Sequence, residues 1–335
     1  MPDSAFLVET TDNPAPPGFV ADMIAASDGI LLRVARWQPA GASAGTVLIA
    51  NGRSEFIEKY FEVIGELLAR GLHVVTFDWR GQGFSGRELP NPRKGHIDDF
   101  SLYGRDLVAV QRQVMDEHCP KPWFALGHSM GGAILLAQSA HLDVERMVLS
   151  APMIGLSGLR FPKGARMLAH CLDMIGLGGA FIPGGGETAY LTKPFPGNVL
   201  TSDAARYARI ADIAALAPGL AVGAPTVGWI NAAFRQMQQF GDPDFALRIA
   251  IPTLIMAAGD DRVVDTLACE RLGAGLKGGG VIVVAQARHE ILIERDAFRS
   301  QFWAAFDAFV PGTRAELAAF AGHGAKVGAK VGGKG

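Results

Sequence analysis

Short apolar runs alternate with helix-length segments along most of this chain, and no other feature restricts its fold as strongly. The runs are rich in β-branched residues and apolar at successive positions, which is typical of strands covered on both faces. They lie at residues 46–50, 73–77, 123–126, 147–149, 253–257 and 281–285, and the helical segments at 60–70, 100–119, 129–141, 264–276 and 297–310. The alternation predicts an α/β fold with a mostly parallel central sheet flanked by helices. A strand at 30–37, paired as a hairpin with the residues around Met23, is expected before them.

One connection is far longer than a crossover between parallel strands requires. About 100 residues separate the runs at 147–149 and 253–257, whereas roughly a dozen suffice for a crossover. We therefore expect an inserted, mainly helical cap between the sixth and seventh strands. The resulting division is an N-terminal extension at 1–18, a core in two parts at 19–151 and 251–311, the cap at 152–250, and a disordered glycine- and lysine-rich tail at 312–335.

An apolar stripe within the expected cap has two interpretations. Its members recur at helical spacing on one face and are Met167, Leu168, Cys171, Leu172, Met174 and Ile175. Such a stripe is usually the buried face of a packed helix, and we favour that interpretation. The alternative is that the stripe lines a groove for an acyl chain.

Composition and charge exclude several kinds of function. The 335-residue chain is 49% hydrophobic and has a formal net charge of −2, so nothing in it indicates a nucleic-acid partner. Its three cysteines are scattered, which predicts neither disulfides nor a metal site. No residue cluster indicates a cofactor. Because neither a secretory signal nor a membrane-spanning stretch is recognised, we expect a cytoplasmic location, with peripheral contact with a membrane left open.

A nucleophilic serine is indicated by Gly127-His128-Ser129-Met130-Gly131. This pattern follows the run at 123–126 directly and opens an apolar helix, which is the context of a nucleophile elbow. The flanking glycines allow the sharp turn from strand to helix without a side-chain collision. Ser129 is therefore the predicted nucleophile.

The serine needs a general base, and the base needs a carboxylate to orient it. Among eight histidines, only His289 follows the last expected strand and precedes the final helix, where a loop can reach the elbow. Asp260 and Asp261 both follow the run at 253–257, and the chain order serine, acid, histidine is the one found with such elbows. From spacing alone the two aspartates are nearly equivalent candidates.

An oxyanion formed during ester hydrolysis must be met by two backbone N–H groups. One belongs to the residue after the nucleophile, Met130, and the other to the loop after the strand at 46–50. That loop reads Asn51-Gly52-Arg53, and we assign the second donor to Arg53. An ion pair of the Arg53 side chain with Glu55 or Glu58 is the simplest structural expectation.

Several motifs together resemble the lysophospholipase (L2 type) and monoacylglycerol lipase branch of the α/β-hydrolases, over roughly residues 20–310. They are Gly52-Arg53-Ser54-Glu55 with Lys59-Tyr60, the segment 78–85, the elbow, Asp261-Arg262-Val263-Val264-Asp265 and Arg288-His289-Glu290. The resemblance implies the α/β-hydrolase fold, Asp261 as the catalytic acid because it stands immediately before the arginine, and acyl esters of glycerol or glycerophosphodiesters as substrates. The chain departs from the family in having Asn51 where histidine is common.

Other functions compete with a lipid ester hydrolase. Residues 81–86 fit a dinucleotide-binding glycine pattern, but Pro90 and Pro92 follow where a helix would have to begin. Carboxylesterases, aminopeptidases and thioesterases share the fold; the isolated acids and many apolar residues of the cap favour acyl esters among them. A non-catalytic ligand-binding protein is a remote alternative, because the chain keeps a nucleophile, a base and an acid.

Overall fold

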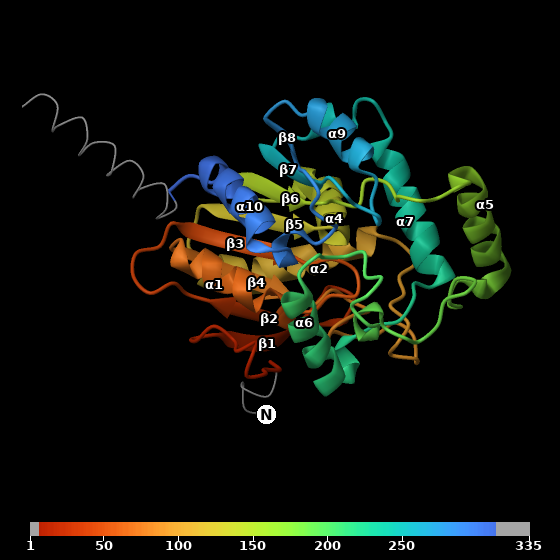
Figure 1. Ribbon diagram of the computed structural model, residues 1–335, viewed down its shortest axis with the longest axis horizontal. Coiled ribbons are helices and arrows are strands. Elements are labelled where there is room, and N and C mark those ends of the chain that lie inside the picture. The colour runs from red at the N-terminus through yellow and green to blue at the C-terminus, as the bar shows by residue number, and fades with distance from the viewer. Residues whose placement is uncertain (1–6, 313–335) are drawn as a thin grey trace, which may run out of the picture.

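A single eight-stranded sheet forms the centre of the chain in the computed structural model, which describes residues 7–312 (Figure 1). The strand order is β1-β2-β4-β3-β5-β6-β7-β8. The strands are β1 (Val20–Ala25), β2 (Leu31–Trp37), β3 (Gly45–Ala50), β4 (Leu72–Phe77), β5 (Trp123–His128), β6 (Arg146–Ser150), β7 (Thr253–Ala258) and β8 (Gly279–Val284). The hairpin β1–β2 pairs antiparallel onto β4, and the strands from β4 to β8 are parallel. The predicted α/β fold is confirmed.

Strand β8 begins and ends earlier than the expected run at 281–285. Pairing with β7 starts at Gly279, whose backbone approaches the Thr253 carbonyl so closely that a Cβ would lie 2.0 Å from its oxygen. Only glycine permits this contact, and Gly279 also has a φ of 115°. Apolar character alone therefore places the start of this strand too late.

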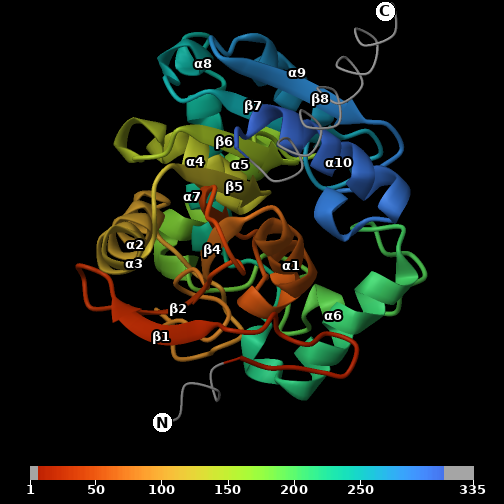
Figure 2. The same ribbon diagram turned by 90° about the vertical axis from the view of Figure 1, so that its left-hand side faces the viewer.

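Helices cover both faces of the sheet (Figure 2). On one face lie α1 (Phe61–Ala69) and α10 (Asp296–Phe309), and on the other α2 (Ser101–Val110), α4 (Met130–Gln138) and α9 (Thr266–Ala274). Successive side chains of a strand point to opposite faces of the sheet, so every central strand contributes side chains to two cores. In β3, for example, Val47 and Ile49 pack with the α1 and α10 side chains, whereas Leu48 and Ala50 pack with those of α2 and α4. The shorter helical segments of the core are η2 (Ile57–Tyr60), η3 (Gln111–Met115), α3 (Asp116–His118), η4 (Ser139–His141) and η8 (Ile291–Ile293).

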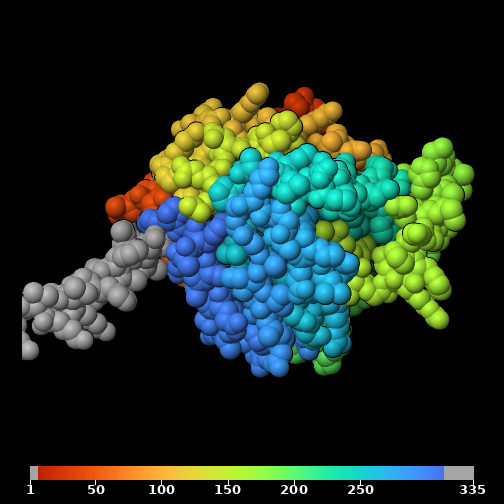
Figure 3. Space-filling model, turned by 90° about the horizontal axis from the view of Figure 1, so that it is seen from above, coloured from red at the N-terminus to blue at the C-terminus, as the bar shows by residue number. Residues whose placement is uncertain are grey.

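The chain between β6 and β7 is mainly helical, as expected. Its elements are α5 (Pro162–Leu172), η5 (Asp173–Leu177), η6 (Tyr190–Thr192), α6 (Ala204–Leu216), η7 (Pro218–Leu220), α7 (Val227–Phe240) and α8 (Phe245–Arg248). Helix α6 shares a small apolar core with Phe56 and Ile293. Helix α5 packs against α7 and stands out from the body of the molecule (Figures 1 and 3).

The apolar stripe of α5 and η5 is exposed, so the favoured packed-helix interpretation is wrong. Met167, Met174 and Ile175 are 67%, 74% and 71% exposed, and Leu168 is 53% exposed. Only Ala169 of α5 is buried, because a different face of the helix meets α7.

Within residues 7–312, no helix is long and apolar enough to span a bilayer. The expected disordered tail lies, apart from Gly312, outside the described residues.

Candidate active site

The predicted elbow forms a tight turn between β5 and α4. Ser129 has φ 49° and ψ −115°, a combination that is unfavourable for a residue with a Cβ and is typical of strained functional positions. Glycine is required beside it, because a Cβ at Gly131 would lie 2.1 Å from the Ala50 carbonyl oxygen. This contact also sets the N-terminus of α4 against the end of β3.

The structure brings the predicted nucleophile, base and acid into one hydrogen-bonded chain. The Nε2 atom of His289 lies 3.0 Å from the Ser129 Oγ, and its Nδ1 lies 2.8 Å from Oδ2 of Asp261. Ser129 and His289 are buried, 8% and 4% exposed. The side chain of Asp260 is instead 44% exposed and faces Arg262 at 3.4 Å, so the geometry favours Asp261 of the two candidates.

The carboxylate of Asp261 is held by its surroundings. Its Oδ1 accepts hydrogen bonds from the Val263 and Val264 N–H groups at 2.8 and 2.9 Å. Burial raises the pKa of Asp261, but the hydrogen bond and charge of His289 and these two N–H groups outweigh burial and lower the pKa. The carboxylate of Asp261 is thus kept ionised. An ionised carboxylate only accepts hydrogen bonds, so the Nδ1 atom of His289 is the donor between them.

The two expected oxyanion donors stand on adjacent pieces of backbone. Met130 opens α4, and Gly131 packs on Ala50 and Asn51 at the start of the loop that carries Arg53. In that loop the Gly52 N–H donates to the Glu55 carboxylate. The next N–H along the loop is that of Arg53.

A buried polar cluster, for which no role was predicted, lies beside Ser129 and His289. Lys59 Nζ is 2.7 Å from Glu55 Oε1 and 2.6 Å from Glu290 Oε1, and the Tyr60 hydroxyl donates to Glu55 at 2.6 Å. The ring centroid of His128 lies 4.9 Å from that of His289. The sequence signal that could have indicated this cluster is the presence of charged residues in the motifs at 52–60 and 288–290.

Burial and neighbouring charge fix the protonation of this cluster. Burial raises the pKa of Glu55, but the charge of Lys59, the charge that His128 acquires only in acid, and hydrogen bonds from Lys59 and Tyr60 lower it to about 2. Burial lowers the pKa of His128 to about 4, so its imidazole is neutral at neutral pH. The set Glu55, His128 and Glu290 has donor atoms close enough for a metal ion, yet the Lys59 ammonium already binds both carboxylates, so the set does not fit a resident cation.

Ser129 and His289 line a cavity of about 270 Å³ between the core and the cap. Its lining combines the polar cluster with apolar side chains from both parts of the chain. The residues are Arg53, Ser54, Glu55, Lys59, Ser129, Met153, Leu156, Tyr190, Leu191, Leu200, Pro225, Trp229, Ile230, Val263, His289 and Glu290.

The loop that carries His289 is braced by the segment 198–203 of the cap. The Glu290 N–H donates to the Leu200 carbonyl at 2.8 Å, and Arg288 Nη1 donates to the Thr201 carbonyl at 2.9 Å. Glu294 accepts from the N–H groups of Arg288 and Ser202 at 3.0 and 2.9 Å. The position of His289 therefore depends on the cap as well as on the core.

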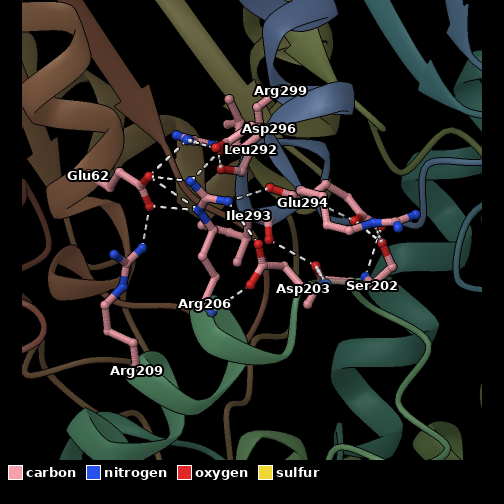
Figure 4. Close-up of polar contacts among 12 residues, drawn as sticks. Glu62, Ser202, Asp203, Arg206, Arg209, Leu292, Ile293, Glu294, Asp296 and Arg299 are labelled. Carbon is pink, nitrogen blue, oxygen red and sulfur yellow. Dashed lines mark hydrogen bonds and ion pairs between the residues drawn. The ribbon is translucent and has the colours of Figure 1, made fainter.

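An ion-pair network secures the same end of the cap (Figure 4). Glu62 of α1 binds Arg206 of α6 at 2.6 Å, Arg299 of α10 at 2.8 Å, and Arg209. Arg206 also contacts Asp296 at 2.7 Å. Burial raises the pKa of Glu62, but hydrogen bonds from Arg206 and Arg209 and the charge of Arg299 lower it to about 2.

Comparisons with known sequences agree with this geometry. A family model described as serine aminopeptidase S33 matches residues 41–296. The chain is 37% identical over 272 residues to the lysophospholipase L2 of Escherichia coli K12, a match that covers 76% of each chain. It is 30% identical over 264 residues to the probable lysophospholipase L2 of Haemophilus influenzae, covering 78% of this chain and 82% of that one. A shorter match, 30% identical over 130 residues, covers 38% of this chain and 41% of the monoglyceride lipase of Rattus norvegicus.

Solved structures have the same fold. A soluble variant of the monoglyceride lipase of Saccharomyces cerevisiae, in complex with a substrate analogue, matches with a TM-score of 0.69 and 20% identity, covering 90% of this chain and 98% of that one. A carboxyl esterase of Bacillus coagulans matches with a TM-score of 0.70 and 17% identity, covering 88% and 100%. The chain therefore belongs to the α/β-hydrolases, in the branch that contains the lysophospholipases L2 and the monoglyceride lipases.

Proposed function

We propose that this ester hydrolase cleaves the acyl ester of lysophospholipids or monoacylglycerols with Ser129 as nucleophile, His289 as general base and Asp261 as the orienting acid. The observation that carries the proposal is the hydrogen-bonded chain from Ser129 through His289 to Asp261. The names of the bacterial and mammalian relatives support lipid esters as the substrate class.

The reaction proceeds in two halves. His289 accepts the Ser129 proton at Nε2 as Oγ attacks the ester carbonyl carbon, and the backbone N–H groups of Met130 and Arg53 stabilise the oxyanion. The tetrahedral intermediate expels the glycerol-type alcohol, which takes the proton from His289, and leaves an acyl-enzyme. His289 then deprotonates a water molecule that attacks the acyl carbonyl, and the fatty acid leaves as Ser129 recovers its proton.

The apolar lining of the cavity favours a substrate that contains an acyl chain. Met153, Leu156, Leu191 and Ile230 are among its apolar lining residues. Leu156 also lines a neighbouring cavity of about 340 Å³ between α5, α7 and the loop after β6. An aliphatic chain buried along these side chains gains roughly 0.8 kcal/mol per methylene group.

Aminopeptidase activity, which the description of the family model names, is the second candidate. An enzyme that binds a free α-amine needs a carboxylate available in its pocket. The acids of this cavity, Glu55 and Glu290, are both engaged by Lys59. This engagement favours ester substrates.

We also propose that residues 152–250 act as a cap that contacts a lipid surface through α5. The exposed apolar side chains of α5 and η5 are accompanied by the exposed cations Arg160 and Lys163. A helix face of this composition is suited to the boundary between anionic headgroups and acyl chains.

Labelling with a fluorophosphonate probe tests the nucleophile. Wild type and the control Ser300→Ala, which changes an exposed serine of α10, should be labelled, whereas Ser129→Ala should not. Turnover of a lysophospholipid and of a monoacylglycerol should fall by about four orders of magnitude or more in Ser129→Ala. Retention of activity within a few-fold of wild type would remove Ser129 from the mechanism.

A further inference from the structure

The side chain of Arg53 lines the same cavity as Ser129. Not all of its N–H groups donate hydrogen bonds within the part of the chain that the structure describes. Its Nη1 donates to the Ser54 hydroxyl at 2.8 Å and its Nη2 to the Gly223 carbonyl at 2.9 Å. The guanidinium lies 5.0 Å from the centroid of the Trp229 ring. Its Nε is buried and finds no acceptor among residues 7–312. A guanidinium has five N–H donors, so that of Arg53 can donate further hydrogen bonds to a ligand.

Arg53 is half-buried. It lacks the counter-ion that the buried arginines Arg33 and Arg80 have. Arg33 pairs with Glu58 and Asp78, and Arg80 with Asp28 and Asp106. Within the described part of the chain Arg53 forms no ion pair, contrary to the expected pair with Glu55 or Glu58. Glu55 binds Lys59, and Glu58 binds Arg33.

The missing counter-ion makes this corner of the cavity a site for an anion. Burial lowers the pKa of Arg53 to about 10, so the group is still cationic at neutral pH. A cation held away from water without a partner is costly, and an anion that enters the cavity offsets that cost. A guanidinium matches the oxygens of a phosphate group particularly well, because it donates two parallel hydrogen bonds.

We propose that the Arg53 guanidinium binds the phosphodiester of the substrate and so makes the enzyme prefer lysophospholipids to monoacylglycerols. This inference rests on the proposed function. Because the Arg53 backbone N–H is assigned to the ester oxyanion, the side chain starts at the reacting carbonyl. In a lysophospholipid only the three-carbon glycerol separates that carbonyl from the phosphodiester, a span that an arginine side chain can match.

The test compares two substrates with the same hexanoyl chain, lysophosphatidylglycerol and monoacylglycerol, as monomers in solution. The readout is the ratio of their kcat/KM values, because a general effect on the oxyanion loop lowers both and cancels. In Arg53→Met the ratio should fall about tenfold or more, and in Arg53→Lys by less. Arg112→Gln, which removes an exposed arginine outside the cavity, should keep the wild-type ratio.

The outcomes separate this inference from the function on which it rests. If wild type hydrolyses neither substrate, the proposed function fails. If wild type hydrolyses them and Arg53→Met keeps the ratio, or loses both activities by the same factor, Arg53 does not bind the phosphodiester and the inference is overturned. High ionic strength should reduce the wild-type ratio and leave that of Arg53→Met unchanged.

Discussion

Asp260 and Asp261 are neighbours in the chain with different chemical surroundings. Asp261 hydrogen-bonds to His289 Nδ1, whereas Asp260 is half exposed beside Arg262. We expect Asp261→Asn to lower kcat by about 10³–10⁴-fold, because the amide does not stabilise the imidazolium. The matched variant Asp260→Asn should retain kcat within a few-fold. Equal losses in steady-state assays of the two variants would contradict the assignment.

His128 makes folding stability depend on pH. Its pKa is about 4 in the folded protein, against an ordinary value of 6.5. Between these two pH values the unfolded chain binds a proton that the folded chain does not, so stability should fall as pH decreases from 6.5 to 4. Urea denaturation across this range should show a shallower fall for His128→Gln. The exposed His141→Gln is the control and should follow wild type; an identical slope in all three proteins would exclude His128 as the cause.

Some site residues could be predicted from sequence and others could not, for a physical reason. Ser129 lies in a local sequence pattern whose glycines are required by backbone contacts, so the pattern by itself indicates the geometry of the elbow. The choice between Asp260 and Asp261 depends on where each carboxylate points, and spacing does not determine that. The role of Lys59 depends on Glu290, 231 positions away, which only the fold brings within 2.6 Å.

At the scale of elements, the strands were predictable and the packing of α5 was not. Strands β3 and β7 are buried at every position, and continuous apolar runs indicate such burial directly. The periodicity of α5 correctly grouped Met167 and Leu168 with its other apolar residues. Periodicity does not indicate whether that face packs against the rest of the protein, because a helix can also expose an apolar face to solvent.

The network around Glu62 should contribute measurably to stability. Glu62→Gln leaves Arg206, Arg209 and Arg299 close together without their shared carboxylate. We expect the free energy of unfolding to fall by about 1–3 kcal/mol. Glu117→Gln, which changes an exposed glutamate, is the control in chemical denaturation.

The same network has a defined pH dependence. Since the pKa of Glu62 is lowered from 4.5 to about 2, its contribution is present above pH 4.5 and is lost as pH falls toward 2. The difference in stability between wild type and Glu62→Gln should therefore shrink over that interval. A difference that stays constant down to pH 2 would mean that the carboxylate charge is not what stabilises the fold.

At the scale of the whole molecule, the projecting α5 should govern binding to lipid. Met174→Asp and Ile175→Asp should weaken binding to anionic phospholipid vesicles in flotation assays, because each places a charge on the apolar face. Leu216→Asp is a matched control, since Leu216 of α6 is 62% exposed but lies outside that face. Hydrolysis of a short soluble ester should remain at the wild-type rate in Met174→Asp. Equal loss of vesicle binding in all three variants would point to general charge repulsion instead.

The bracing of the His289 loop by residues 198–203 limits how such enzymes can be recombined. Exchange of the whole cap with that of a relative would also replace the segment that positions the Leu200 and Thr201 carbonyls, which hold Glu290 and Arg288. A chimera designed to acquire a new substrate range should therefore place its second junction before Asn198 and retain the native sequence from there onward. The earlier part of the cap, which includes α5, is the part whose exchange leaves this bracing of the His289 loop intact.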